Sequence, residues 1–139
     1  MLDIKEVISM SQGLKVLYVE DNEEARESTL GLLENIFNHI TIAVNGKDGL
    51  EKFHQESSSY DLIISDINMP KMNGADMVRV IKQTRKDIKI FLLSAYDESE
   101  YPVDAEIKID ARLHKPMNFN SFLEELKKIY SKDTKGLSI

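Results

Sequence analysis

The chain contains no cysteine, which excludes disulfide bonds and thiol chemistry and fits a reducing compartment. It also lacks long hydrophobic runs, since the longest span about six residues and roughly twenty are needed to cross a bilayer. The N-terminal sequence MLDIKEVISM has neither the basic start nor the apolar core of a signal peptide. We therefore expect a cytoplasmic protein with no direct contact with a membrane.

Positive charge is also in short supply. The 18 lysines and arginines are outnumbered by 24 acidic residues, so the net charge is −6, and no basic cluster stands out along the chain. Because duplex binding depends on neutralising phosphates with Lys and Arg, this balance argues against nucleic acid as a direct partner.

The rest of the composition is that of one soluble globular domain. The 139 residues suffice for a single hydrophobic core, and 42% are hydrophobic and 30% charged. Short runs rich in Val, Ile and Leu alternate with segments whose apolar residues recur at helical spacing. This alternation predicts an α/β fold, a doubly wound parallel sheet with helices on both faces. We expect strands at residues 14–19, 40–44, 62–65, 88–93 and 111–114, and helices at 22–37, 45–55, after 74 and at 120–130.

Four expected strands each end in a residue that can handle phosphate or a divalent metal. These residues are Glu20-Asp21 after KVLYV, Asp66 after DLIIS, Ser94 after IKIFLL, and Lys115 after the apolar stretch around Leu113. Open parallel sheets bind ligands beyond the carboxyl ends of their strands. We therefore expect these side chains to converge although they lie far apart in the sequence.

Three acids at one sheet edge repel one another, so they need a cation or raised pKa values. Magnesium suits them because it takes oxygen ligands, keeps several waters and usually binds one or two carboxylates. Asp21 and Asp66 are the expected direct ligands, Glu20 acts through water, and the backbone carbonyl of Asn68 supplies another oxygen. The alternative is that Glu20-Asp21-Asn22 merely caps a helix while Asp66 opens a turn.

Asp66 is the expected nucleophile, because a carboxylate can attack phosphorus and form an aspartyl phosphate. Phosphoryl transfer asks a protein mainly for positioning and charge neutralisation, which a metal on one side and the Lys115 ammonium on the other would supply. The Ser94 hydroxyl would donate to a phosphoryl oxygen, and the small Ala95 beside it leaves the approach open. Alternatively, Ser94 simply ends its strand and Lys115 is a solvated surface charge.

Together these residues resemble the motif set of the receiver domain of two-component response regulators, with Asp66 in the run SDINMPKMNG. The resemblance covers roughly residues 14–131. It implies the CheY-like, flavodoxin-like fold with strand order 2-1-3-4-5. The receiver domain is expected at 13–131, between an N-terminal appendage or linker at 1–12, where apolar residues at helical spacing also fit a short docking helix, and a C-terminal tail at 132–139.

The resemblance also implies residue roles. Asp66 would be the phosphoacceptor, charged from a phosphohistidine on a sensor histidine kinase or phosphotransfer protein. Ser94 would move onto the phosphoryl group, and Lys115 would contact it, aimed by a cis peptide bond before Pro116. Asn68 would complete the metal site of the acids named above. Gly74 would occupy a turn position that needs a positive φ.

Two departures from the receiver pattern stand out. Receivers usually carry Tyr or Phe three residues before the lysine, but this chain has Arg112, whose charge is not expected to be buried in the same slot. Residues 97–110 contain Pro102 and lack the usual glycine, so a short or irregular helix is expected there.

The leading interpretation is a phosphorylation-controlled switch that acts on a downstream protein, as a monomer or weak homodimer. Its only chemistry would be phosphorylating itself and losing the phosphoryl group, so it is not an enzyme in the usual sense. An alternative is a receiver module of a hybrid histidine kinase or multidomain regulator. A phosphohydrolase of the D-x-D pattern is disfavoured because its second acid is replaced by Asn68. A degenerate interaction module is disfavoured because no acceptor or metal residue is missing.

Overall fold

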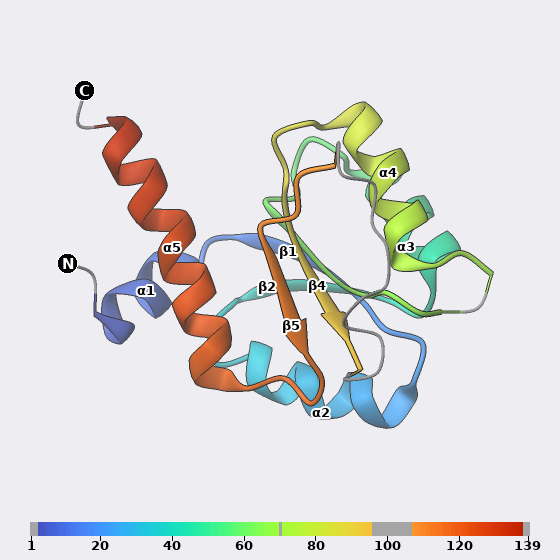
Figure 1. Cartoon of the computed structure of the whole chain (residues 1–139), viewed down its shortest axis with the longest axis horizontal. Coiled ribbons are helices and arrows are strands. Elements are labelled where there is room, and N and C mark those ends of the chain that lie inside the picture. Colours follow the sequence, from blue (N-terminus) through green and yellow to red (C-terminus); the bar gives the residue numbers. More distant parts are fainter. Residues whose placement is uncertain (1–2, 70, 96–106, 138–139) are drawn as a thin grey trace.

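The structure is a computed structural model that describes residues 3–69, 71–95 and 107–137, with side chains of the last helix described as far as Tyr130. Five parallel strands form one sheet in the predicted order β2-β1-β3-β4-β5 (Figure 1). The strands are β1 (Lys15–Val19), β2 (His39–Ala43), β3 (Leu62–Asp66), β4 (Lys89–Ser94) and β5 (Ala111–His114). Each lies within one residue of its predicted position. The expected irregular helix at 97–110 falls mostly outside the described residues.

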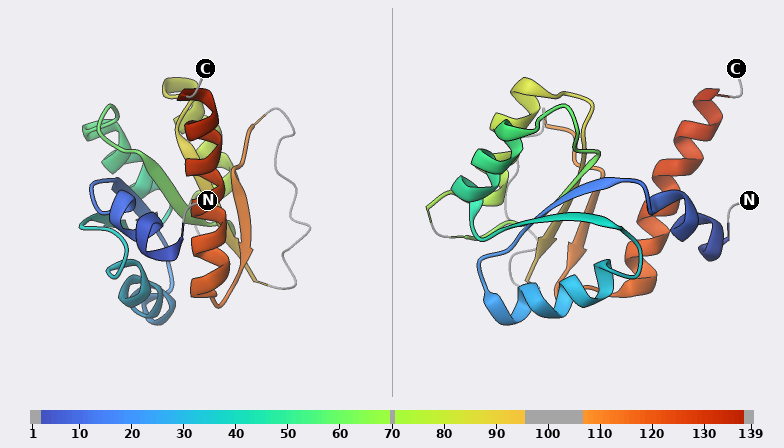
Figure 2. Two further views of the ribbon diagram at one scale, coloured as in Figure 1. Left: turned by 90° about the vertical axis from the view of Figure 1, so that its left-hand side faces the viewer. Right: turned by 180° about the vertical axis from the view of Figure 1, so that it is seen from behind.

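The helices of the described residues cover both faces of the sheet, as predicted (Figures 1 and 2). They are α1 (Ile4–Ser11), α2 (Glu23–Leu33), α3 (Gly46–Gln55), α4 (Gly74–Thr84) and α5 (Phe119–Leu137). One core joins the sheet to α1, α2 and α5 through Val7, Val16, Tyr18, Leu33, Ile64, Phe91, Phe122 and Leu126. The other joins the opposite face to α3 and α4 through Leu17, Val19, Phe53, Ile63, Met77, Val78, Ile81 and Leu92. Burial on both faces explains why β3 is apolar without alternation.

Four helices, α2 to α5, each begin at an asparagine that follows a strand, and Asn118 caps α5 by accepting the Ser121 backbone N–H at 2.9 Å. The side chains of Asn22, Asn45 and Asn73 each accept the backbone N–H of the third following residue at 2.8 Å. Such caps satisfy one of the free N–H groups at a helix start. The caps fix the starts of α2, α3 and α4 at the edge of the sheet where the sequence predicted the functional site.

Two helices end where the apolar pattern did not predict. The expected end of α2 at residue 37 was wrong: the helix stops at Leu33, and Ile36 and Phe37 are buried from turns that follow it. The expected end of the last helix at Tyr130 was also wrong, because α5 continues to Leu137. Apolar periodicity reports which residues are buried, whereas a helix can start or stop independently of that burial.

The N-terminal segment forms the docking helix that the sequence left as one of two possibilities. α1 begins at the cap Asp3 and lies beside α5 in both views of Figure 2. Val7 is 1% exposed and belongs to the core that joins the sheet to α1, α2 and α5, and Ser11 is also buried. Of the helices in the described residues, none is both long and apolar enough to cross a bilayer.

Candidate functional site

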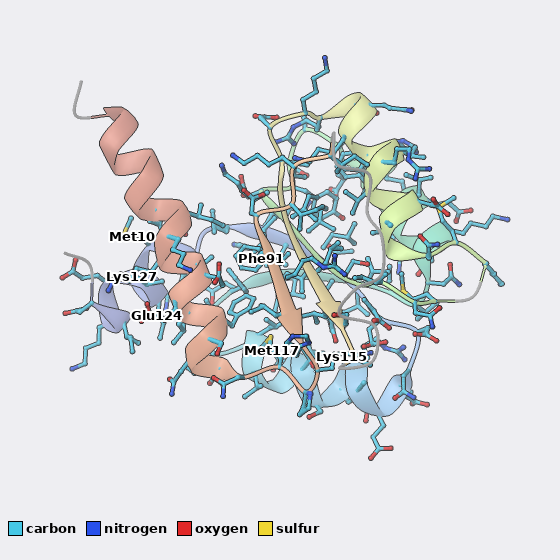
Figure 3. The ribbon with its side chains drawn as sticks, viewed as in Figure 1. Met10, Phe91, Lys115, Met117, Glu124 and Lys127 are labelled. Carbon is cyan, nitrogen blue, oxygen red and sulfur yellow. The ribbon has the colours of Figure 1, made fainter. Side chains whose placement is uncertain are left out.

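The structure brings the predicted strand-end residues together. Glu20 follows β1, Asp66 ends β3 and Lys115 follows β5, yet the Lys115 Nζ lies 3.1 Å from Glu20 Oε1 and 3.1 Å from Asp66 Oδ2. Figure 3 shows Lys115 at the arrowhead end of the sheet. The predicted convergence is therefore confirmed for the acceptor candidate and its cation, and Lys115 is not a solvated surface charge.

Burial makes this cluster electrostatically strained. Glu20 is 0% exposed and Asp66 is 2% exposed. Burial, with the neighbouring charge of Asp66, raises the pKa of Glu20 to about 7. Burial likewise raises the pKa of Asp66, although the contacts with Glu20 and Lys115 oppose the shift. Burial alone would lower the pKa of Lys115, but the charges of Asp66 and Glu20 outweigh it and raise that pKa. One ammonium thus does not fully compensate two buried carboxylates.

The acids form a donor set that fits a divalent metal. Carboxylate oxygens of Glu20, Asp21 and Asp66 all lie within 4.8 Å of one another, and Asp21 is exposed at the mouth of the cluster. The second oxygen of Asp66, Oδ1, is buried and has no hydrogen-bond partner among the described residues. A buried carboxylate oxygen without a partner is costly unless something binds it. Oxygen-only donors of this kind match the preference of Mg²⁺.

Local hydrogen bonds hold the first acid turn in place. The Glu20 amide donates to the Ala43 carbonyl at 3.1 Å, which extends the pairing of β1 with β2 by one residue. The backbone N–H of Asn22 donates to Glu20 Oε2 at 3.3 Å, and the side chain of the same asparagine caps α2. The guanidinium of Arg26 donates to the Glu20 carbonyl at 3.0 Å. Asn22 is thus the helix cap of the alternative interpretation, but the acids beside it also form the cluster.

The lysine and serine are held by one backbone contact between their strands. The Lys115 amide donates to the Ser94 carbonyl at 2.8 Å, and the peptide bond between Lys115 and Pro116 is cis, as the resemblance implied. Ser94 is 2% exposed at the end of β4, one residue beyond the partner of Asp66 in the strand register. Ser94 thus ends its strand at the acid edge. Asn68 is exposed in the loop after Asp66, and its carbonyl as a metal ligand stays a prediction.

The predicted reason for Gly74 was wrong. Its φ is not positive, and the positive φ of this loop, 71°, belongs to Lys71 instead. A Cβ built on Gly74 would collide with the carbonyl oxygen of Asp66, so this glycine allows the loop backbone to return against the acceptor residue. Arg112 is exposed on β5, as its charge led us to expect.

Sequence reasoning missed Arg26 and the close approach at Gly74. The sequence carried no signal for Arg26, because its contact is with a backbone carbonyl that no side-chain pattern encodes. For Gly74, the sequence shows only that a glycine follows the loop. Its close approach to the backbone of Asp66 cannot be predicted, because a sequence pattern does not encode the distance between two backbone segments.

Comparison with known proteins agrees with this geometry. The sequence profile described as "Response regulator receiver domain" matches residues 16–127. The response regulator receiver protein CpdR of Brucella abortus is 27% identical over 116 residues, which cover 83% of this chain and 95% of CpdR. The transcriptional regulatory protein CusR of Escherichia coli K12 is 37% identical over 117 residues, 82% of this chain and 50% of CusR.

The chain therefore spans only half the length of CusR, and as little as 14% of another matched relative. Among solved structures, the response regulator TrrA of Thermotoga maritima in complex with Mg²⁺ and BeF is 37% identical with a TM-score of 0.70, over 83% of this chain and 97% of TrrA. The chain belongs to the response regulator receiver domains of two-component signal transduction.

Proposed function

We propose that Asp66 is the phosphoacceptor of this receiver domain. The observation that carries the proposal is the environment of its buried carboxylate. One oxygen lies 3.1 Å from the Lys115 ammonium, and the other has no hydrogen-bond partner among the described residues. An oxygen of Asp66 attacks the phosphorus of a phosphohistidine, forming an O–P bond. The N–P bond breaks, and the leaving imidazole nitrogen keeps the electron pair and takes a proton from solvent.

Asp21 and Asp66 would hold Mg²⁺ directly, Glu20 through a water molecule, and Asn68 through its backbone carbonyl. The acid cluster and its raised pKa values support this assignment. When bound, the metal supplies positive charge that neutralises the phosphoryl oxygens. Lys115, already beside Asp66, neutralises them from the other side.

Ser94 and Lys115 would move toward the phosphoryl group and so shift the domain between two conformations. Ser94 supports this role because it ends β4 at the acid edge, and its carbonyl is bonded to the Lys115 amide. A displacement of either backbone would therefore shift the other through this hydrogen bond. Arg112 cannot act as a buried aromatic ring would, because it is a charged side chain that lies exposed.

The phosphoryl donor would be a sensor histidine kinase or phosphotransfer protein, and the output would be contact with a downstream protein. We assign the receiver unit to residues 13–131 and expect it in the cytoplasm as a monomer or weak homodimer. The same switch can serve in a chain of this size, as in CpdR, or as a module of a hybrid kinase or longer regulator, as the half-length match to CusR suggests. Catalysis is confined to phosphorylation and dephosphorylation of the chain itself.

Labelling with a radioactive small-molecule phosphodonor tests the proposal. The wild-type chain should take up one phosphoryl group in Mg²⁺, and Asp66→Ala should take up none. Asp87→Ala is the matched control, because this carboxylate is 84% exposed and forms an ion pair with nearby Arg85. Unchanged labelling of Asp66→Ala would refute the assignment. Rapid, repeated release of phosphate from a generic phosphoester would instead favour a phosphohydrolase.

A further inference from the structure

Arg26 makes the contact on which this inference rests. Its guanidinium Nη1 donates a hydrogen bond of 3.0 Å to the backbone carbonyl of Glu20. That carbonyl belongs to the peptide that joins Glu20 to Asp21, so the bond restrains the peptide plane between the two acids. Arg26 thus touches the backbone of the acid turn without being one of the acids.

Among the described residues, the other hydrogen bonds of the turn hold different groups. Strand pairing holds the Glu20 amide, and the Asn22 amide holds the Glu20 carboxylate. Asn22 also fixes the start of α2. The direction in which Asp21 leaves the strand depends on the Glu20–Asp21 peptide, and Asp21 is the exposed acid that must reach inward to the buried pair.

A cation at this place runs against two electrostatic preferences. The amino end of a helix favours negative charge, which Glu23 and Glu24 in the first turn of α2 supply. A positive charge beside a metal site also repels the metal. A hydrogen bond from a charged donor is roughly twice as strong as one between neutral groups, and the planar guanidinium holds its direction. A structural tie to the acid turn accounts for an arginine that simple charge preference disfavours.

We propose that Arg26 is a positioning residue for the metal ligands, holding the Glu20–Asp21 peptide so that both carboxylates converge with Asp66. The inference rests on the proposed function, in which these acids bind Mg²⁺. The inference predicts the direction in which Mg²⁺ affinity changes when Arg26 is removed, and a purely electrostatic role predicts the opposite direction. If Arg26 positions the acids, its removal weakens Mg²⁺ binding. If it acts only through its charge, its removal strengthens Mg²⁺ binding.

The test measures Mg²⁺ affinity by isothermal titration calorimetry and thermal stability in the metal-free state. Arg26→Met should weaken Mg²⁺ binding about tenfold, the lower end of the usual effect of residues that orient metal ligands. Arg26→Lys should lose less affinity, because its ammonium can still donate but on a flexible stem. The matched control is Arg79→Met on the other face of the sheet, where Arg79 pairs with Asp76 at 3.1 Å and is half exposed.

Mg²⁺ affinity in Arg26→Met equal to or tighter than that of the wild type, with Arg79→Met unchanged, would overturn the inference. Should Arg26→Met fail to fold, Arg26→Lys decides, and wild-type affinity there overturns the inference as well. Failure of the wild-type chain to bind Mg²⁺ would instead overturn the proposed function. A lower melting temperature with unchanged affinity would show a purely structural role and so also contradict the inference.

Discussion

At the carboxyl ends of the strands, Glu20 and Asp66 are buried with raised pKa values, and one Asp66 oxygen has no hydrogen-bond partner among the described residues. At the opposite end of the sheet, α1 closes the core with Val7. There the Ser11 hydroxyl donates to the Val7 carbonyl at 2.6 Å and lies 3.0 Å from the Tyr130 hydroxyl. The Ser11 hydroxyl is thus hydrogen-bonded at the end closed by α1, whereas the buried carboxylates at the carboxyl ends of the strands are not fully compensated.

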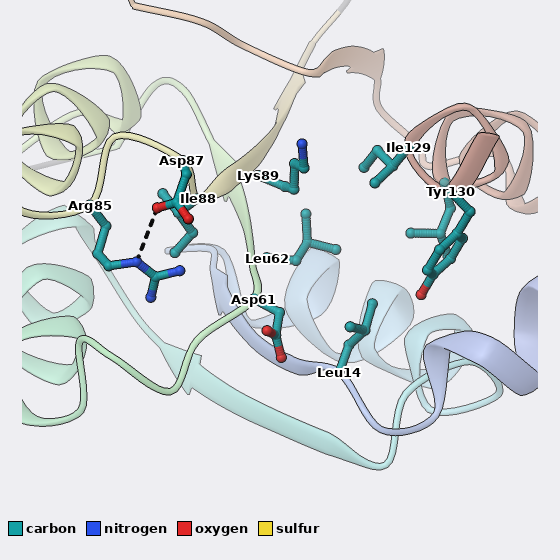
Figure 4. A pocket seen from close by; sticks show the side chains of 10 residues that line it. Leu14, Asp61, Leu62, Arg85, Asp87, Ile88, Lys89, Ile129 and Tyr130 are labelled. Carbon is teal, nitrogen blue, oxygen red and sulfur yellow. Dashed lines mark hydrogen bonds and ion pairs between the residues drawn. The ribbon is translucent and has the colours of Figure 1, made fainter. Parts of the chain in front are cut away.

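A hollow of about 210 Å³ also lies at the end closed by α1 (Figure 4). Leu14, Leu62, Ile129 and Tyr130 line it from the start of the sheet and from α5. Its volume is below the roughly 300–1,000 Å³ of typical ligand pockets. The comparison teaches that the cost of unpaired charge is concentrated at the edge where a metal and a phosphoryl group can offset it. The other edge supplies stability through packing.

The largest effect should come from Gly74→Ala, because the new Cβ would collide with the Asp66 carbonyl oxygen. We expect a loss of about 3 kcal/mol in the free energy of unfolding, as overpacking against backbone cannot relax easily. Mg²⁺ affinity should fall as well, since the acceptor itself is displaced. Urea unfolding and calorimetry measure the two effects.

Gly31→Ala is the matched control for that substitution. Nothing lies within 4 Å of a Cβ built on Gly31, which is exposed on α2. Alanine there should raise the free energy of unfolding by about 0.5–1 kcal/mol, because it favours the helix. Equal effects of the two substitutions would break the link between Gly74 and Asp66.

Val7→Ala should separate the two ends of the sheet. Val7 is 1% exposed in the core beneath α1, α2 and α5, so its truncation should lower the free energy of unfolding by about 2 kcal/mol. Mg²⁺ affinity should stay at the wild-type value because α1 lies at the far end from the acids. The control is Ile4→Ala in the same helix, where the side chain is 48% exposed and the expected change is within about 0.5 kcal/mol. Weakened Mg²⁺ binding in Val7→Ala would show that the ends are coupled.

Glu20→Gln should make the metal-free protein more stable at pH 8 by about 1 kcal/mol, roughly 3–5 °C in melting temperature. Removing the charge relieves the cost of ionising a buried acid, and the lost attraction to Lys115 offsets part of the gain. Mg²⁺ should then stabilise the variant less than the wild type. Glu124→Gln on the exposed surface of α5 is the control, and it should change neither quantity.

The same substitution should flatten the dependence of stability on pH. The pKa of Glu20 is about 7 in the folded state against an ordinary value of 4.5, so the folded protein holds more protons than the unfolded chain between these values. Without metal, wild-type stability from this group is fully present below pH 4.5 and is lost as pH rises through about 7. Urea unfolding across this window, in a chelator, should show a steeper fall for the wild type than for Glu20→Gln. Identical slopes would contradict the burial of this charge.

The smallest effect should come from Ser11→Ala, about 0.5–1 kcal/mol, because its hydrogen bonds are between neutral groups. A double-mutant cycle with Tyr130→Phe isolates the hydroxyl contact between α1 and α5. Independent, fully additive effects would show that this contact does not tie the helices together.

Much of the fold and site could be predicted because a parallel sheet gathers strand ends on one edge. That rule alone places Glu20, Asp66, Ser94 and Lys115 together, and the structure agrees. The length of α5 could not be predicted from apolar spacing, since the sequence of its last turns, SKDTKGL, contains a single apolar residue. The roles of Arg26 and Gly74 could not be predicted either, because both depend on distances to backbone carbonyls that no side-chain pattern encodes.

A crystal structure with Mg²⁺ and beryllofluoride, a stand-in for the phosphoryl group, tests the central claim most directly. We predict beryllium bonded to a carboxylate oxygen of Asp66, the metal on the oxygens of Asp21 and Asp66, and Lys115 Nζ and Ser94 Oγ drawn onto the fluorines. Beryllium on another acid would contradict the account. So would an unmodified Asp66 with Lys115 still 3.1 Å from both buried carboxylates.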